Sequence, residues 1–162
     1  MSTQVVLLAF SGAIGLAIGD QALFASFVLI GPRLALLFTS VSPILGALLG
    51  LLFLGERLSG YALLGISTSV AGVAWVIAER PHANAVTGQL RTKGLLLALL
   101  AAVCHATGYM LSKRGMGHAW LPAAQHLAPQ TATLIRLAFA TLTIAPMLGA
   151  REWRHARQLA RA

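Results

Sequence analysis

Four polar side chains interrupt apolar runs in which charges are otherwise rare, and these residues could do chemistry. Asp20 lies inside the first run, and Arg136 lies about two turns inside the last. His105 and Tyr109 are four residues apart in another run, so on a helix they share one face. Charged groups in such surroundings are usually paired, water-facing or functional, because their burial is costly. We therefore take these four residues as candidates for a substrate or proton pathway.

Each candidate has more than one possible role. Asp20 could exchange a proton, because burial disfavours the charged form of a carboxyl group; alternatively, it caps a break in the helix or pairs with Arg136. Arg136 could instead bind an anionic group of a substrate, or extend its guanidinium to the membrane interface. His105 and Tyr109 could line a cavity or make hydrogen bonds between helices.

The composition indicates a protein that is surrounded by lipid. Of 162 residues, 57% are hydrophobic and 10% are charged, whereas a soluble domain has about 25% charged residues. The formal net charge is +8, but the basic residues lie in short gaps between apolar runs, which is typical of membrane orientation signals rather than of a nucleic-acid surface. The composition predicts an all-α, multi-pass integral membrane protein of the cell membrane, with the lipid bilayer and no nucleic acid as a partner.

The motifs that would indicate an enzyme are not found in the sequence. It has no G-x-x-x-x-G-K-[ST] loop, no nucleophile with its base and no metal-ligand spacing. The single cysteine, Cys104, lies in an apolar run, where a buried thiol is usually a small hydrophobic side chain. We therefore expect no catalytic activity, no cofactor and no metal.

The first predicted span runs from about Gln4 to Ile30 and allows two interpretations. It is either one continuous helix that holds Asp20 at depth, or two pieces that break near Gly19. We favour one helix, because the 16 residues before Asp20 are too few for a span. Gly15 and Gly19 form a small-x-x-x-small pair, which predicts the close approach of a neighbouring helix.

The second span lies within PRLALLFTSVSPILGALLGLLFLGERLS, residues 32–59. Its uncharged part, Leu34 to Leu54, has roughly 21 residues and would extend about 31 Å as a helix, close to the hydrocarbon thickness of a bilayer. Pro43 in its middle removes a backbone hydrogen bond and predicts a kink. Ser40 and Ser42 are close enough to give the freed carbonyl group a partner.

The kink and the end of this span carry further hypotheses. Pro43 is a candidate hinge that lines the substrate path, as broken helices do in transporters, or it produces a static kink. Gly55 and Glu56 are predicted as turn residues, with the carboxylate of Glu56 solvated beside Arg57.

Three more spans bring the expected number to about five. We predict them at Tyr61–Ala78, at Gly94–Ser112 and at about Pro129–Leu148. Residues 81–93 are polar and are predicted to be a linker between two halves, and a basic tail follows the last span.

Several of these pieces together resemble a known family. They are the run from Ala22 to Arg33, the pair Ser42-Pro43, Gly46, the segment Leu54-Gly55-Glu56-Arg57-Leu58, Gly65 and Ala71-Gly72-Val73. This set resembles the drug/metabolite transporter superfamily and, more narrowly, the EamA-type transporters. The resemblance implies a fold of ten transmembrane helices, built as two inverted repeats of five. It also implies a secondary transporter, expected to be an exporter of small metabolites or drugs in the inner membrane, that works by alternating access, with proton coupling as a candidate driving force.

The resemblance covers part of such a transporter. Residues 1–80 are similar to the last three helices of a first repeat, residues 81–93 to the linker, and residues 94–162 to the first two helices of a second repeat with a basic tail. We expect either a partial chain or a truncated protein that pairs with another copy or with the missing helices. A non-transporting scaffold or assembly partner is the alternative function, and a small dimeric multidrug pump is a more distant one.

Overall fold

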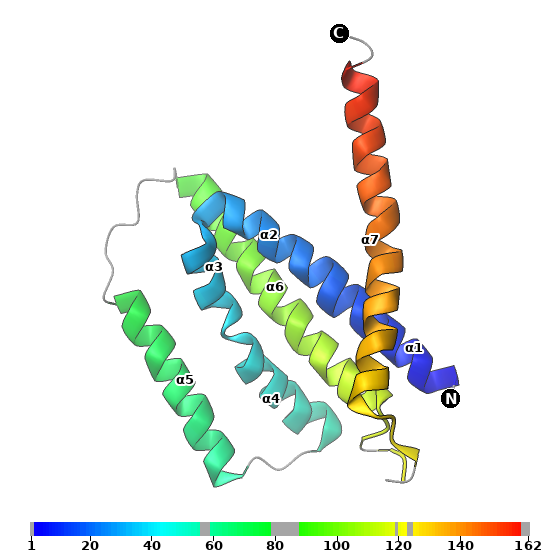
Figure 1. Ribbon diagram of the computed structural model, residues 1–162. Helices are drawn as coiled ribbons and strands as arrows, with labels where there is room; N and C mark the ends of the chain where they lie inside the picture. The colour runs from blue at the N-terminus through cyan, green and yellow to red at the C-terminus, as the bar shows by residue number, and fades with distance from the viewer. Residues whose placement is uncertain (1, 56–58, 79–87, 119, 123–124, 160–162) are drawn as a thin grey trace.

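The computed structural model describes residues 2–55, 59–78, 88–118, 120–122 and 125–159, and its regular elements are all helices (Figure 1). This confirms the predicted fold class of an all-α membrane protein. The elements in chain order are α1 (Ser2–Ser11), the π-helix η1 (Gly12–Ile18), α2 (Gly19–Ile30), α3 (Pro32–Thr39), α4 (Ser42–Leu54), α5 (Gly60–Ala78), α6 (Gly88–Gly115) and α7 (Pro129–Leu159).

The first predicted span is one continuous helix, as favoured from the sequence. The residues at its internal junctions, Ser11, Ile18 and Gly19, all have right-handed helical backbone angles. The sequence did not indicate the π-helical turns of η1, which end directly before Gly19 and Asp20. Segments of π-helix within α-helices occur frequently at functional sites.

The second predicted span is broken rather than kinked. α3 ends at Thr39 and α4 begins at Ser42, so Pro43 lies in the first turn of α4, where its missing N–H is least costly. The Ser42 hydroxyl donates to the Thr39 carbonyl at 2.5 Å, which is the carbonyl that Pro43 cannot reach. The Ser40 hydroxyl donates to the Leu37 carbonyl at 2.6 Å. Ser42 is therefore the predicted partner of the freed carbonyl, whereas Ser40 bonds a different carbonyl at the break between the two helices.

Two glycines end helices with backbone angles that favour glycine. Gly31 has φ 82° between α2 and α3, and Gly55 has φ 64° after α4. The N–H of Gly55 donates to the carbonyl of Gly50, so this position is a turn as predicted. Glu56 lies outside the described residues.

α6 is the central helix. It contacts α1, η1, α2, α3 and α4, and it runs antiparallel to the continuous helix of α1, η1 and α2 (Figure 1). The two pack most closely at glycines: a Cβ atom added to Gly108 would lie 2.8 Å from the Cα atom of Gly15. The Ser11 hydroxyl donates to the Gly108 carbonyl at 2.7 Å across this contact. The predicted close approach at Gly15 is thereby confirmed, and the neighbouring helix is α6.

Two helices extend further than the sequence predicted. α6 begins at Gly88, so the polar residues from there to Lys93, predicted to be linker, form its first turns. The hydroxyl of Thr92 donates to the carbonyl of Gly88 at 3.0 Å within these turns. α7, which contacts α1 and η1, continues through Pro146 and into the basic tail. Polar residues thus prolong both helices, because backbone hydrogen bonding does not require apolar side chains.

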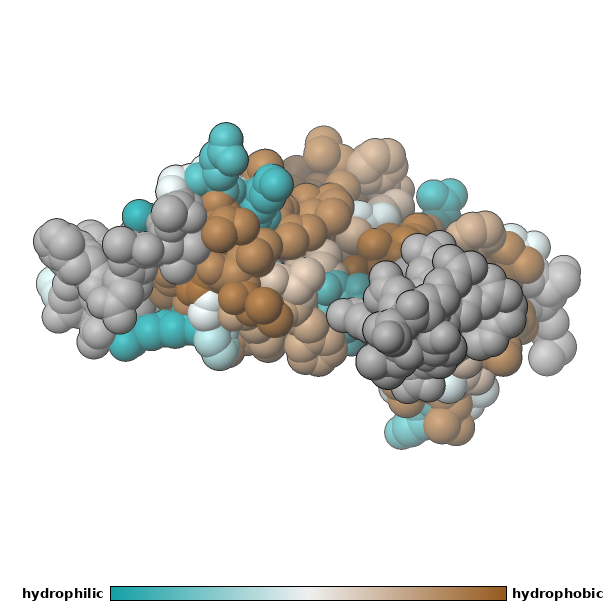
Figure 2. Space-filling view, turned by 90° about the horizontal axis from the view of Figure 1, so that it is seen from above, coloured by the Kyte–Doolittle hydropathy of each residue, from teal (hydrophilic) through white to brown (hydrophobic). Residues whose placement is uncertain are grey.

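Three helical stretches of the described chain are long and apolar enough to cross a membrane: Thr3–Ile30, Pro32–Phe53 and Gly88–Gly115. These are the first, second and fourth predicted spans. α5 is a shorter apolar helix, and α7 is not among the three, so the predictions of spans three and five stay open. The surface seen in Figure 2 is mainly hydrophobic, with hydrophilic residues in small groups. Large apolar side chains such as Leu52 and Leu64 are exposed, as expected of helices that contact lipid.

Candidate functional site

All four residues singled out in the sequence line one cavity. Its volume is about 140 Å³, and its lining comes from the continuous first helix, from α6 and from α7. The lining residues are Gly15, Leu16, Asp20, His105, Tyr109 and Arg136. His105 and Tyr109 share the face of α6 that their spacing predicted.

Asp20 and His105 form a close pair across two helices. The Nε2 atom of His105 lies 3.0 Å from the Oδ1 atom of Asp20. The His105 side chain is 16% exposed and that of Asp20 is 41% exposed. Gly19 allows this approach, because a Cβ atom there would lie 2.8 Å from the imidazole Cδ2 atom. This distance is that of a hydrogen bond, and the Asp20 side chain also lines the cavity.

Arg136 reaches the same cavity from α7. Its Nη1 group donates to the Ser112 hydroxyl at 3.4 Å, and its Cζ atom lies 5.9 Å from the centroid of the Tyr109 ring. The Nε atom is buried and has no hydrogen-bond partner. The sequence allowed a pair between Arg136 and Asp20, but Asp20 pairs with His105, and within the described chain the guanidinium has no carboxylate partner.

The cavity lies well inside the membrane-spanning helices. Asp20 is three to four residues from the middle of the Thr3–Ile30 stretch, and His105 is equally close to the middle of α6. At ~1.5 Å per residue, both lie roughly 5 Å along the helix from its midpoint. Polar side chains at this depth require partners or water.

Other residues near the cavity were not singled out from the sequence. Ser112 lies seven residues after His105, two turns along the same face of α6. This spacing indicates that its hydroxyl faces the same side of the helix as the imidazole. Gly12, in η1, packs directly against α7, because a Cβ atom there would clash with the backbone carbonyl of Arg136. No sequence pattern indicated the π-helical turns.

Pro43 is exposed and lies outside the lining of the cavity, so its role as a hinge stays a prediction. The described residues contain no group of three or more histidine, cysteine, aspartate or glutamate side chains that could hold a metal ion.

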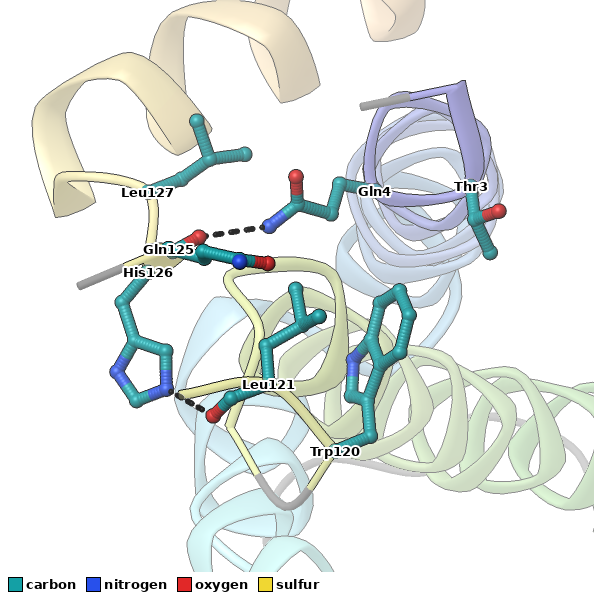
Figure 3. Close-up of a pocket in the computed structure, with 7 residues that line it drawn as sticks. All are labelled: Thr3, Gln4, Trp120, Leu121, Gln125, His126 and Leu127. Carbon is teal, nitrogen blue, oxygen red and sulfur yellow. Dashed lines mark hydrogen bonds between the residues drawn. The ribbon is translucent and has the colours of Figure 1, made fainter. Parts of the chain in front are cut away.

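A second cavity of about 440 Å³ lies at the N-terminal end of α1 (Figure 3). The Gln4 side-chain amide donates to the Gln125 carbonyl at 3.2 Å, and the His126 imidazole donates to the Leu121 carbonyl at 3.0 Å. Its lining, Thr3, Gln4, Trp120, Leu121, Gln125, His126 and Leu127, contains no aspartate, glutamate, lysine or arginine. This cavity is therefore the weaker candidate for a site that handles charge.

Of the comparisons with known proteins, the one with protein families found a match. The EamA-like transporter family matches residues 2–78, which include α1 to α5 and the Asp20 side of the cavity. A search of curated proteins found no match, and neither did a search of solved structures. His105, Tyr109 and Arg136 lie outside the matched residues, so the comparison with a second repeat stays a prediction. Residues 2–78 are thus similar to the EamA-like transporter family, which is part of the drug/metabolite transporter superfamily.

Proposed function

We propose that the protein is part of a secondary transporter, with the cavity around Asp20 and His105 on its transport path. The observation that carries the proposal is the meeting of an aspartate, a histidine, a tyrosine and an arginine in one cavity, with Asp20 and His105 near the middle of long apolar helices. Charged side chains at such depth are rare and commonly mark substrate or proton pathways. The match of residues 2–78 to a transporter family supports the same function.

In this proposal the Asp20–His105 pair carries the coupling proton. The Nε2 atom of His105 and the Oδ1 atom of Asp20 lie 3.0 Å apart, so each side chain can stabilise the change in charge when the other gains or loses a proton. Solute export would follow from alternating access, with the pair exposed first to one side of the membrane and then to the other. The contact of α7 with η1 supplies a helix–helix interface whose rearrangement could open the cavity.

Vesicle transport tests the proposal. The full chain is reconstituted in vesicles loaded with an extract of small metabolites, a pH gradient is imposed, and mass spectrometry identifies the metabolites that leave. We expect gradient-dependent loss of specific metabolites with the unsubstituted protein. Asp20→Asn should abolish this loss, because the amide cannot exchange the proton, and His105→Asn should reduce it strongly.

Glu56→Gln is the matched control, since it removes a carboxylate that is predicted to lie in a turn. Transport that survives Asp20→Asn would contradict the proton role of the pair. A folded chain that transports nothing under any gradient, but binds another membrane protein, would favour the assembly-partner alternative.

A further inference from the structure

The cavity contains a cation, Arg136, that forms no direct ion pair with an acid among the described residues. Arg136 is half-buried, its Nε group has no partner, and the hydroxyl of Ser112 is a distant acceptor at 3.4 Å. The nearest carboxylate in the lining, Asp20, is engaged by His105. An arginine that is held away from water without an acid partner favours an external anion, because guanidinium N–H groups donate to carboxylate or phosphate oxygens in a planar, two-pronged contact.

The remaining lining indicates the size and character of such an anion. Leu16 and the Tyr109 ring offer apolar contact, and Gly15 leaves space beside the guanidinium, since a Cβ atom there would lie 3.7 Å from Nη2. An apolar cavity of about 150 Å³ in another protein holds benzene, and this cavity measures about 140 Å³. The apolar body of a bound molecule can therefore be no larger than about one ring.

The charges of the cavity also favour a bound anion together with a proton. The ionisable groups that face it are Asp20 from α2, His105 and Tyr109 from α6 and Arg136 from α7. An ionised Asp20 would offset the charge of Arg136 across the cavity. A bound anion would leave a net negative charge at depth, and a proton taken up by the Asp20–His105 pair would restore neutrality.

We propose that the cavity takes a small organic anion, with a carboxylate-like group at the Arg136 guanidinium and an apolar body against Leu16 and Tyr109. This inference rests on the proposed transport function and names the substrate class of the same site. Arg136 is then the residue that selects anions over neutral molecules of the same shape.

Binding, measured without transport, tests the inference. The full chain in lipid nanodiscs is titrated calorimetrically with benzoate and with benzamide, which share their ring and differ in charge. We expect benzoate to bind at least about tenfold more tightly than benzamide, as a charge-assisted contact predicts. Arg136→Gln should weaken benzoate binding about tenfold or more, and Arg136→Lys should weaken it less because the charge remains.

Arg33→Gln is the matched control, because this arginine is exposed at the start of α3, outside the cavity, and it should leave benzoate binding unchanged. Equal binding of benzoate and benzamide, binding of neither, or unchanged benzoate binding in Arg136→Gln would overturn the inference. The far-ultraviolet circular dichroism of each variant confirms that its helices remain folded.

Repeating the titration in buffers with different ionisation enthalpies separates this inference from the proposed function. Uptake of about one proton per benzoate supports both, as the charge balance requires. Arg136-dependent binding without proton uptake supports the anion site and counts against the proton role of Asp20 and His105.

Discussion

The contact between Gly15 and Gly108 offers the sharpest test of how the cavity is held together. A Cβ atom at position 108 would lie 2.8 Å from the Cα atom of Gly15 and 3.3 Å from the carbonyl oxygen of Ser11. Ordinary van der Waals contact begins near 3.4 Å, so Gly108→Ala requires α6 and the first helix to separate by about 0.6 Å. Both near atoms belong to backbone, which cannot move aside as a flexible side chain would.

The loss in free energy of unfolding caused by Gly108→Ala can be estimated by comparison with a glycine in open surroundings. Overpacking a close interface costs about 1–3 kcal/mol, whereas alanine gains about 0.5–1 kcal/mol over glycine inside a helix. Gly65, in α5, has nothing within 4 Å of an added Cβ atom. Gly65→Ala should therefore show the gain in helix propensity without any overpacking. The propensity gain is common to both substitutions, and we expect Gly108→Ala to be about 1–3 kcal/mol less stable than Gly65→Ala.

Unfolding of the two variants in mixed micelles, followed by circular dichroism as a denaturing detergent is added, gives the difference in free energy of unfolding. The Ser11–Gly108 hydrogen bond of 2.7 Å should lengthen in Gly108→Ala as the helices separate. Equal stabilities for Gly108→Ala and Gly65→Ala would refute the argument, since they would show that the glycine contact is not tight.

Two further substitutions test the break within the second span and the turn at its end. Ser42→Ala removes the donor to the Thr39 carbonyl and should lower the free energy of unfolding by about 1 kcal/mol, whereas Ser42→Thr, which keeps the hydroxyl, should lower it less; equal losses would contradict this role of the hydroxyl. Gly55→Ala forces a Cβ atom into the left-handed conformation at φ 64° and should cost about 1–2 kcal/mol in the same measurement, whereas Gly46→Ala, in an open position of α4, should not destabilise.

The sequence was informative where a residue type determines its own local structure. Proline cannot donate at position 43, so the sequence predicted a kink near it and a hydroxyl partner, and the structure has a break instead of the kink. The choice between them did not, because it depends on whether the helix restarts before or at the proline. The length of α7 was missed for a related reason: hydropathy reports where a helix leaves the membrane, and a helix can continue beyond that point.

The candidate residues were identifiable from the sequence, but their meeting was not, because it depends on the register between antiparallel helices. Asp20 and His105 are 85 positions apart, and a slip of one turn along α6 would move the imidazole by about 5.4 Å, beyond reach of the carboxylate. The register is fixed at the glycines: once Gly15 lies on Gly108, His105 is one turn along α6 and Gly19 is one turn along the first helix. Gly19 leaves space for the imidazole ring where a larger residue would displace it. The pattern first interpreted as a helix-packing motif therefore also sets the distance between the two groups proposed to share a proton, so substitutions at these glycines should disturb stability and proton coupling together.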